Sequence, residues 1–206
     1  METWQRDLSA AAQTAGLTSG TDRFFFLRHG QTDYNLNGIV QGWTDIPLNA
    51  TGEAQAVEAA AVLKGQGVTA LMTSPLGRAR RTAEIVSATI GVSITGLDPR
   101  LRERSFGGYE NQPDPGSVWQ RSDRDMETPV AFADRVIAGL NEALCCGVPL
   151  VVAHGGVRRV LLFALGLAVP PQAELNAVPL EFIRRDGAWT VLPVLAGGRA
   201  AGLSDA

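Results

Sequence analysis

The sequence predicts a single three-layer α/β/α domain with a largely parallel central sheet. Short apolar runs of strand length alternate with helix-like segments along the chain, which is the pattern of an α/β fold. Two of the runs, 24–27 and 150–153, are apolar throughout, as strands buried on both faces are. The 206 residues are 45% hydrophobic and 19% charged, which suits one domain with a sizeable core.

The first elements follow from apolar runs and from glycine. Residues 23–28 predict the first strand, and a loop that contains glycine and asparagine follows it to Asn49. An alanine-rich helix is expected from Thr51 to about Lys64, where the glycines that follow commonly end helices. Residues 68–73 predict a second short strand.

The pair Ser74-Pro75 predicts the start of the next helix. Serine accepts a hydrogen bond from a free N–H of the first turn, and proline has no N–H to leave unpaired. The helix carries Arg78 near its start and is expected to reach about Ile90. A short strand is then expected at residues 93–97.

Residues 98–128 are irregular and rich in glycine, proline and arginine. Long segments without regular structure are usually functional loops or lids in compact domains, so we expect a substrate loop here. Thr128-Pro129 then caps a helix that reaches about Leu144. A strand at residues 149–153 and a helix over 156–165 follow.

The ends of the chain are expected to lie at the periphery. Residues 1–22 read as a polar leader, with a short helix around residues 9–15, ahead of one domain over 23–206. Residues 177–194 predict a β-hairpin with Asp186-Gly187 at its turn. We expect this hairpin to be exposed and to offer a surface for a homodimer, although nothing in the sequence requires one.

Composition and charge exclude several classes of function. The net charge of -3 and the pI of about 5.4 lack the basic footprint of a nucleic-acid-binding protein. No apolar run approaches the ~20 residues that span a membrane, and residues 1–22 do not have the layout of a signal peptide. Cys145 and Cys146 are adjacent on a predicted helix and indicate packed thiols in a reducing compartment, so we expect a cytoplasmic protein.

The chain has only two histidines, and both follow an apolar run and precede glycine. His29 is followed by Gly30, and His154 is followed by two glycines. Ligands bind at the carboxyl ends of the strands in an open α/β sheet. Scattered structural histidines would not be expected to share this position, so we expect both rings at one functional site.

Two arginines join the histidines at the same edge of the predicted sheet. Arg28 ends the first strand, and Arg78 lies in the first turn of the helix after the second strand. Guanidinium groups match pairs of phosphate oxygens, and a helix N-terminus adds N–H donors. An arginine in the first turn opposes the helix dipole, which favours an anionic partner for it. The cluster therefore predicts a site for a phosphoryl dianion.

This cluster is suited to covalent chemistry. A neutral histidine is a competent nucleophile toward phosphorus, and nearby arginines lower its pKa from the usual value of about 6.5. A leaving alkoxide then needs a proton, and Glu103 and Glu110 in the irregular segment are both candidates to donate it. The residues alone do not rank these two carboxylates.

Five segments, taken in order, resemble the motifs of the histidine phosphatase superfamily, also called the phosphoglycerate mutase-like family. The Arg-His-Gly triplet alone is a weak signal, but the ordered set covers most of residues 23–160 and is specific. The segments are Leu27-Arg28-His29-Gly30-Gln31-Thr32 with the similar stretch 48–56 after it, residues 74–83, residues 101–110, Glu127-Thr128 with Arg135, and Val152-Ala153-His154-Gly155-Gly156.

The resemblance implies a role for each matching residue. His29 is the nucleophile that becomes phosphohistidine, Arg28, Arg78 and His154 hold the phosphoryl group, and Glu103 is the proton donor. The family needs no metal, and no cofactor is implied. Further residues implied around the phosphate and the substrate are Asn35, Gln41, Gly42 and Gly155. Departures from the family pattern at Gln31-Thr32 and Asn111 affect substrate contacts more than chemistry.

Four functions compete, and we expect a phosphomonoesterase of a small phosphorylated metabolite, in which water resolves the phosphohistidine. A phosphoglycerate mutase would carry a longer insertion with extra basic residues, and the stretch between Glu103 and His154 leaves little room for one. A non-catalytic phospho-ligand-binding module would have lost a catalytic residue, and none is lost. A protein phosphohistidine phosphatase would be shorter and would lack the carboxylate segment 101–110.

Several of these residues also have a structural interpretation. Glu103 has an ion pair with Arg102 or Arg104 as its alternative role. Aromatic residues that either line the substrate pocket or serve packing are Trp43, Tyr109 and Trp119. Arginines expected to be solvated are Arg80, Arg81, Arg121 and Arg124.

Overall fold

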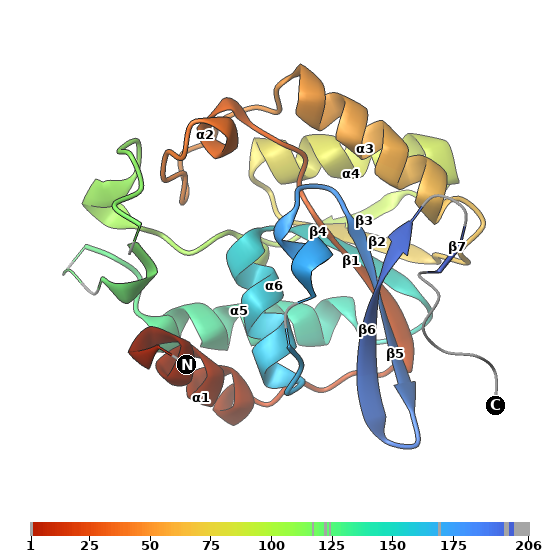
Figure 1. The fold of residues 1–206 in the computed structure, drawn as a ribbon. Helices are drawn as coiled ribbons and strands as arrows, with labels where there is room; N and C mark the ends of the chain where they lie inside the picture. The colour runs from red at the N-terminus through yellow and green to blue at the C-terminus, as the bar shows by residue number, and fades with distance from the viewer. Residues whose placement is uncertain are drawn as a thin grey trace.

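The computed structural model describes residues 2–116, 118–121, 123, 125–168, 170–195 and 198–199. Its described strands are β1 (Arg23–Arg28), β2 (Ala70–Thr73), β3 (Ile94–Leu97), β4 (Pro149–Ala153), β5 (Pro179–Arg185), β6 (Ala188–Leu195) and β7 (Gly198–Arg199). They form one mixed sheet in the spatial order β3-β2-β4-β1-β5-β6-β7 (Figure 1).

The two strands that precede the histidines are neighbours in the sheet. β4 lies between β1 and β2 and runs parallel to both, with Leu150 opposite Phe25 on one side and Leu71 on the other. β3 runs parallel to β2 at the edge, and β5 pairs antiparallel with β1. The carboxyl ends of β1, β2 and β4 therefore open on one edge of the sheet, as the sequence predicts.

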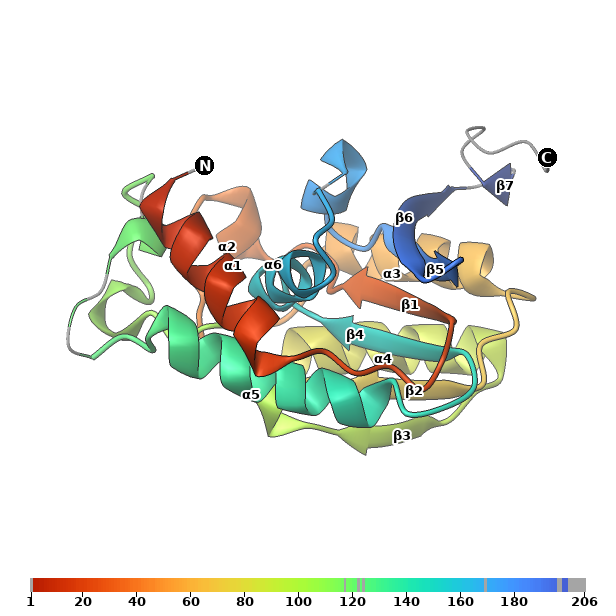
Figure 2. The ribbon, with the colours of Figure 1, turned by 90° about the horizontal axis from the view of Figure 1, so that it is seen from below.

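Helices cover both faces of the sheet and complete the predicted three-layer α/β/α architecture. The helices are α1 (Thr3–Ala15), α2 (Asp33–Leu36), α3 (Ala50–Leu63), α4 (Gly77–Ile90), α5 (Pro129–Ala143) and α6 (Gly155–Ala164). α1, α5 and α6 pack on one face, and α3 and α4 pack on the other (Figure 2). None of the helices described has the length and apolar character to cross a bilayer.

The run of apolar residues in β1 is explained by burial on both faces. Phe24 and Phe26 pack among side chains of α5 and α6, whereas Phe25 and Leu27 pack among those of α3 and α4. All four are fully buried, because successive side chains of a strand point to opposite faces and both faces are covered here.

The N-terminal helix differs from expectation. It begins at Thr3 rather than near residue 9, and it buries Leu8, Ala11 and Ala12 in the core formed with α5 and α6. Apolar residues from Trp4 to Ala15 recur at the three- and four-residue spacing of one helical face. The segment expected to be a polar leader therefore contributes packing to the fold.

Two local predictions are wrong. α4 begins at Gly77, and its first N–H donates to Asp45 Oδ1 at 2.7 Å, so Ser74 is not its N-cap. Cys145 and Cys146 are exposed rather than packed, because α5 ends at Ala143 and the thiols lie in the turn beyond it.

The predicted hairpin is confirmed, but its position is not peripheral. β5 and β6 pair antiparallel, and Asp186 and Gly187 have φ angles of 50° and 79°, as a tight hairpin turn requires. β5 lies inside the sheet between β1 and β6, and its residues from Pro179 to Phe182 are buried. The expectation of an exposed hairpin is therefore wrong for its first strand.

The irregular segment contains only single turns of 3₁₀ helix among its described residues: η1 (Pro99–Leu101), η2 (Gly107–Tyr109) and η3 (Val118–Gln120). A fourth turn, η4 (Pro171–Glu174), lies between α6 and β5. These loops rise above the carboxyl edge of the sheet. They are long enough to form the walls of a site there.

Candidate active site

A cavity of about 200 Å³ lies at the carboxyl edge of the sheet. Strand ends form its base, and the irregular segment and α6 form its sides. The predicted site residues that line it are Arg28, His29, Asn35, Gln41, Gly42, Arg78, Glu103 and Gly155. The remaining predicted residue, His154, is fully buried beside His29, with 5.2 Å between the ring centroids. The structure thus brings together every residue that the sequence assigned to the site.

His29 is held in one tautomer by the backbone. Its ring is only 3% exposed, and Nδ1 lies 2.7 Å from the carbonyl oxygen of Gly30. A carbonyl oxygen can only accept a hydrogen bond, so Nδ1 carries the proton. Nε2 is then left with its lone pair free.

The charge state of His29 follows from its surroundings. Burial is the largest cause that lowers the pKa of His29 well below its usual value, and the guanidinium groups of Arg78 and Arg28 lower it further. The hydrogen bond to Gly30 opposes this shift but is the smallest contribution. The ring is therefore neutral near pH 7, as a nucleophilic histidine must be.

His154 presents a second neutral ring. It is the residue before α6, and its Nε2 lies 2.8 Å from Ser74 Oγ at the end of β2. Burial and the positive charge of Arg78 lower the pKa of His154 well below its usual value. Its Nδ1 is buried and has no hydrogen-bond partner among the described residues.

Arg78 is fixed by backbone carbonyls. It is 1% exposed, and its terminal nitrogens donate to Thr44 O at 2.9 Å and Gly42 O at 2.8 Å. Burial lowers the pKa of Arg78. Its Nε has no partner among the described residues, which leaves a buried N–H available to an anion.

Arg28 is arranged in the same way. Its Nη1 donates to the carbonyl oxygen of Glu174 at 2.7 Å, and its buried Nε has no partner among the residues described. Burial, followed by the positive charge of Arg158, lowers the pKa of Arg28 to about 10. The guanidinium remains charged near pH 7.

The two candidate carboxylates have different surroundings. The carboxylate of Glu110 binds the backbone of the surrounding loops, since it accepts from the N–H groups of Trp43, Thr44 and Phe106, each at 3.0 Å. Glu103 lines the cavity, and its Oε2 accepts from the N–H of Gly156 at 2.9 Å. The geometry therefore places Glu103 in the lining of the cavity, whereas Glu110 is not among its lining residues.

Gly156 is required for this position of Glu103. A Cβ atom at residue 156 would lie 2.1 Å from Glu103 Oε1 and 2.7 Å from the ring of Trp119. Both carboxylate oxygens of Glu103 accept from backbone N–H groups, the second being that of Arg104 at 2.8 Å. The alternative of an ion pair with Arg102 or Arg104 is not what the structure shows, because Arg104 donates to carbonyls of residues 119–127 and Arg102 Nε donates to the carbonyl of Pro99.

Arg135 holds the backbone of Glu103 in place. Its guanidinium donates to the carbonyl oxygen of Glu103 and to those of Arg100 and Arg102, each at 2.8 Å. Glu127 pairs with the same guanidinium through both oxygens, at 2.5 and 2.7 Å. Glu127 and Arg135, whose role was open at the level of sequence, therefore support the backbone of Glu103.

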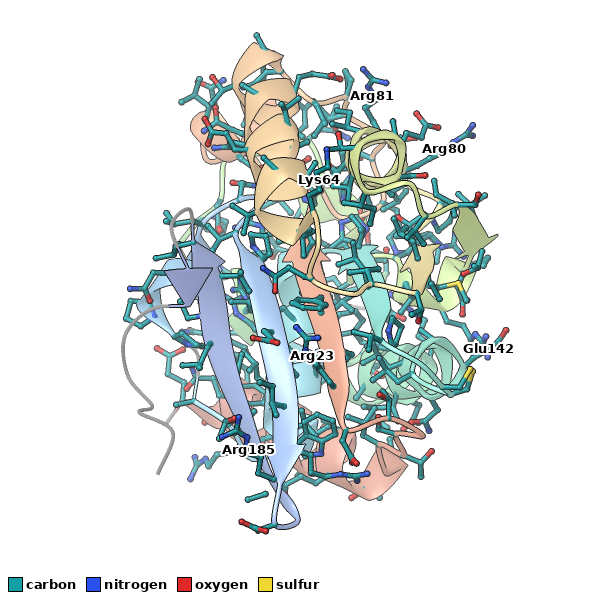
Figure 3. All side chains as sticks on the ribbon, turned by 90° about the vertical axis from the view of Figure 1, so that its right-hand side faces the viewer. Arg23, Lys64, Arg80, Arg81, Glu142 and Arg185 are labelled. Atoms are coloured by element: carbon teal, nitrogen blue, oxygen red, sulfur yellow. The ribbon has the colours of Figure 1, made fainter. Side chains whose placement is uncertain are left out.

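The aromatic residues divide between lining and packing. Trp119 lines the cavity. Trp43 donates its Nε1–H to the carbonyl oxygen of Glu103 at 2.7 Å, and the guanidinium of Arg121 lies over Tyr109. Arg80 and Arg81 are solvated on the outer side of α4, as predicted (Figure 3). Arg124 lies outside the described residues.

Sequence reasoning missed several residues around the cavity, among them two arginines and one asparagine. Arg158 and Arg159 line it from the second turn of α6, and Asn176 donates to the carbonyl oxygen of His29 at 2.9 Å. Arg78 was identified because it lies near the N-terminus of a helix that follows a strand, and Arg158 and Arg159 have the same placement after β4. Asn176 lies in a loop and has no comparable signal.

The described residues include no group of three or more His, Cys, Asp or Glu side chains placed to hold a metal ion. The cavity is lined by four arginines and by the carboxylates of Glu103, Asp114 and Glu174, with the two neutral rings at its base. The guanidinium groups are hydrogen-bond donors suited to an anion.

Comparison with known proteins agrees with the geometry. A model of the histidine phosphatase superfamily (branch 1) matches residues 24–181. The uncharacterized phosphatase PhoE of Bacillus subtilis (strain 168) is 41% identical over 142 residues, which cover 66% of this chain and 73% of that protein. A probable phosphoglycerate mutase GpmB of Yersinia enterocolitica is 34% identical, with 73% of this chain and 77% of that protein covered.

Other matches show the extent of the shared domain. The chain is 38% identical over 178 residues to agropine synthesis reductase of Rhizobium rhizogenes but covers only 41% of that protein. The structure of a mycobacterial glucosyl-3-phosphoglycerate phosphatase with VO3 matches at a TM-score of 0.67 and 28% identity, covering 83% of this chain and 97% of that one. The matched segment contains both histidines, both arginines of the base and Glu103, and the chain belongs to the histidine phosphatase superfamily, branch 1.

Proposed function

We propose that the chain is a metal-independent phosphomonoesterase that hydrolyses a small phosphorylated metabolite through a phosphohistidine on His29. One observation carries the proposal. A neutral ring with its proton on Nδ1 and a free lone pair on Nε2 lies at the base of a cavity lined by arginines. That is the state in which histidine attacks phosphorus.

The unpartnered nitrogens define where the phosphoryl group binds. Arg28 Nε, Arg78 Nε and His154 Nδ1 are all buried and lack hydrogen-bond partners among the described residues. We assign the hydrogen bond between Ser74 Oγ and His154 Nε2 with the hydroxyl as the donor, which leaves the ring proton on the otherwise unpartnered Nδ1. Three N–H donors then surround a phosphoryl group placed against His29.

The reaction proceeds in two displacements at phosphorus. His29 Nε2 forms a bond to phosphorus while the P–O bond to the leaving group breaks, and Glu103 gives its proton to the leaving oxygen. Glu103 then takes a proton from a water molecule, whose oxygen attacks the phosphohistidine. The P–N bond breaks, phosphate leaves, and both residues return to their starting states.

Hydrolysis is favoured over transfer by the wall of the cavity. The described residues of the irregular segment that line it, apart from Glu103, are Phe106, Asp114, Val118 and Trp119, none of which is a cation. The buried guanidinium of Arg104 is occupied by backbone carbonyls. The described part of the irregular segment therefore supplies no basic clamp to retain a dephosphorylated sugar acid for rephosphorylation.

The test is phosphate release from p-nitrophenyl phosphate and a panel of phosphorylated metabolites, with and without EDTA. We expect turnover that EDTA does not change, an acid-labile phosphoenzyme on rapid quench, and a loss of at least ~10⁴-fold in kcat for His29→Ala. Activity that His29→Ala retains would overturn the proposal. Conversion of 3-phosphoglycerate to its isomer without phosphate release would instead establish a mutase.

A further inference from the structure

Cys145 and Cys146 form a pair of free thiols outside the proposed active site. Both are exposed, and their Sγ atoms lie 3.4 Å apart. The pair lies before the first residue of β4, whereas His154 follows the last, so the thiols are at the other end of this strand from the cavity. They are the only cysteines of the chain. A ligand that needs two thiols can therefore find them only here.

The backbone on both sides of the thiols is fixed by hydrogen bonds to other segments. The carbonyl oxygen of Leu144 accepts from the N–H of Gly20 at 2.9 Å. The N–H of Val148 donates to Thr69 Oγ1, also at 2.9 Å. Mainly side-chain rotation is then left to be restricted when a ligand joins the two sulfurs, which lowers the cost of binding.

The position of the two sulfurs suits one bridging atom better than a disulfide. Neighbouring Cα atoms are about 3.8 Å apart across a trans peptide, below the ~4.4–6.8 Å that disulfides usually span. An atom bonded to both sulfurs at ~2.3 Å, the length of a zinc–thiolate bond, would make an S–X–S angle of about 95° at the observed 3.4 Å separation. Such an angle is that of a pyramidal three-coordinate centre such as trivalent arsenic, and it is narrower than the tetrahedral angle of zinc sites.

Two thiols are also the complete ligand set at this surface. The described residues include no group of three or more His, Cys, Asp or Glu side chains placed to hold a metal ion. Glu142, on the surface three positions before Cys145 (Figure 3), pairs with Arg100. A tetrahedral metal ion would therefore lack two protein ligands, whereas an arsenic(III) centre with one organic substituent needs only two sulfurs. Thiolates are soft ligands, which matches a soft acceptor of this kind.

The protonation of the pair favours the same class of ligand. The hydrogen bond with Cys146 is the largest cause that raises the pKa of Cys145, so the Cys145 thiol is protonated near pH 7. A protonated thiol reacts poorly with oxidants and alkylating agents, because the thiolate is the nucleophile. An arsenic(III) oxide brings its own base. Two As–S bonds form, the arsenic–oxygen bond breaks, and the oxygen leaves as water with both thiol protons, while arsenic stays trivalent.

We infer that Cys145 and Cys146 form a modification site that binds one trivalent arsenical through both sulfurs. The ligand class is an arsenic(III) oxide or hydroxide that carries one organic substituent. The hydrogen bonds of Leu144 and Val148 hold the turn that presents both thiols to the same atom. The site does not depend on the proposed phosphatase reaction, because it lies at the opposite end of β4.

The test is titration of the full chain with phenylarsine oxide after anaerobic removal of reductant. Mass spectrometry should show one phenylarsenic group per chain, bound with loss of two hydrogens, and both free thiols should disappear. Dithiothreitol should release the group, whereas mercaptoethanol at the same thiol concentration should not. No adduct, or an adduct that joins two chains, would overturn the site.

Single serine variants separate a two-sulfur site from ordinary thiol reactivity. Cys145→Ser and Cys146→Ser each keep one exposed thiol, which a maleimide should still label. Each variant should bind phenylarsine oxide at least ~100-fold more weakly, since the second bond to a chelated atom forms within the molecule. Both side chains are exposed, so neither substitution disturbs the core. Wild-type affinity in either variant would overturn the pair as the site.

Thr69→Val tests whether the turn positions the thiols. It keeps the branched side chain but removes the oxygen that accepts from Val148, so the dissociation constant should rise ~2- to 10-fold. Thr95→Val is the matched control, because it removes a similar hydrogen bond, to the carbonyl oxygen of Leu71, and should leave the dissociation constant unchanged. No rise in Thr69→Val, or an equal rise in both variants, would contradict a site held by this turn. None of these measurements depends on turnover, so their outcome is separate from that of the proposed phosphatase function.

Discussion

The base of the cavity and its outer wall are built in different ways. At the base, Arg28, His29 and His154 lie at strand ends, and Arg78 lies in the first turn of a helix. Their fixed contacts are mostly with backbone carbonyls. The outer wall consists of loops, in which Glu103 and Glu174 are held by contacts with residues of α5 and α6.

This difference suggests that the base determines the reaction and that the wall determines the choice of substrate. The strand ends fix the backbone of the base, but the guanidinium groups of Arg28 and Arg78 are held by carbonyl oxygens of Glu174, Gly42 and Thr44, which lie outside the sheet. The wall has no strand backbone to fix it, and its side chains depend on a few ion pairs and close glycine contacts. We expect changes at the base to abolish the reaction and changes in the wall to alter which substrate is used, with Glu103 as the exception.

Among substitutions in the wall, we expect the largest loss of kcat at Glu103 and little loss at Glu110. Glu103→Gln should lower kcat for alkyl phosphates ~10²- to 10⁴-fold, because it removes the proton donor. The loss should be smaller for p-nitrophenyl phosphate, whose leaving group departs without a proton. Glu110→Gln should instead lower the free energy of unfolding by about 2 kcal/mol, since it weakens hydrogen bonds to a charged acceptor. Equal losses of kcat in the two variants would contradict this division.

The base of the cavity was predicted from the sequence, whereas the contacts of its outer wall were not. β1 and β4 were predicted with their observed bounds, because strands buried on both faces are apolar throughout. The base followed from them, since its residues are adjacent in sequence to strand ends. Glu103 and Glu110 were not ranked by the residues alone, because their difference arises from contacts with residues 43, 44 and 156, far away along the chain.

Other misses have similar physical causes. Ser74-Pro75 carries a typical helix-start pattern, yet the Ser74 hydroxyl is taken by His154 and the helix is capped by Asp45 from another loop. Tertiary contacts therefore override the local pattern. The spacing of the apolar residues in α1 predicts a buried face, but the polar residues between them led to the expectation of a polar leader.

The neutral rings at the base predict a stability that depends on pH. Both histidines have pKa values lowered in the folded state, so the unfolded chain binds more protons below about pH 6.5. Their contribution is present above that pH and is lost as the pH falls. Between pH 7.5 and 5.5 the free energy of unfolding should drop by about 2–3 kcal/mol, as each ring contributes about 1.4 kcal/mol per pH unit.

Urea unfolding at the two pH values measures this drop. His154→Gln removes one of the two rings and should reduce the drop by about half. An undiminished drop in this variant, or a wild-type protein equally stable at both pH values, would show that the rings are not buried neutral.

The contact of Arg135 with the backbone of Glu103 predicts a smaller loss of kcat than the Glu103→Gln substitution does. Glu127→Gln should weaken the ion pair that holds Arg135 against the carbonyl of Glu103. We expect kcat to fall about 10-fold with little change in KM, because Glu103 moves relative to the leaving group while the base still binds phosphate. Arg135→Lys should not preserve activity, since an ammonium cannot reproduce the paired donors. A rise in KM without loss of kcat would place the brace in substrate binding instead.

The smallest effect is expected where the N-terminal helix meets the wall. The ring of Trp4 lies 5.5 Å from that of Trp119, and the guanidinium of Arg159 lies over both rings, at 5.8 and 5.0 Å from their centroids. Trp4→Leu keeps an apolar side chain but removes the aromatic contacts, each of which contributes about 0.5–1.5 kcal/mol. Because Trp119 and Arg159 line the cavity and Trp4 does not, KM should rise a few-fold while kcat stays the same. A fall in kcat instead would mean that changes in the wall alter the positions of the reacting groups at the base.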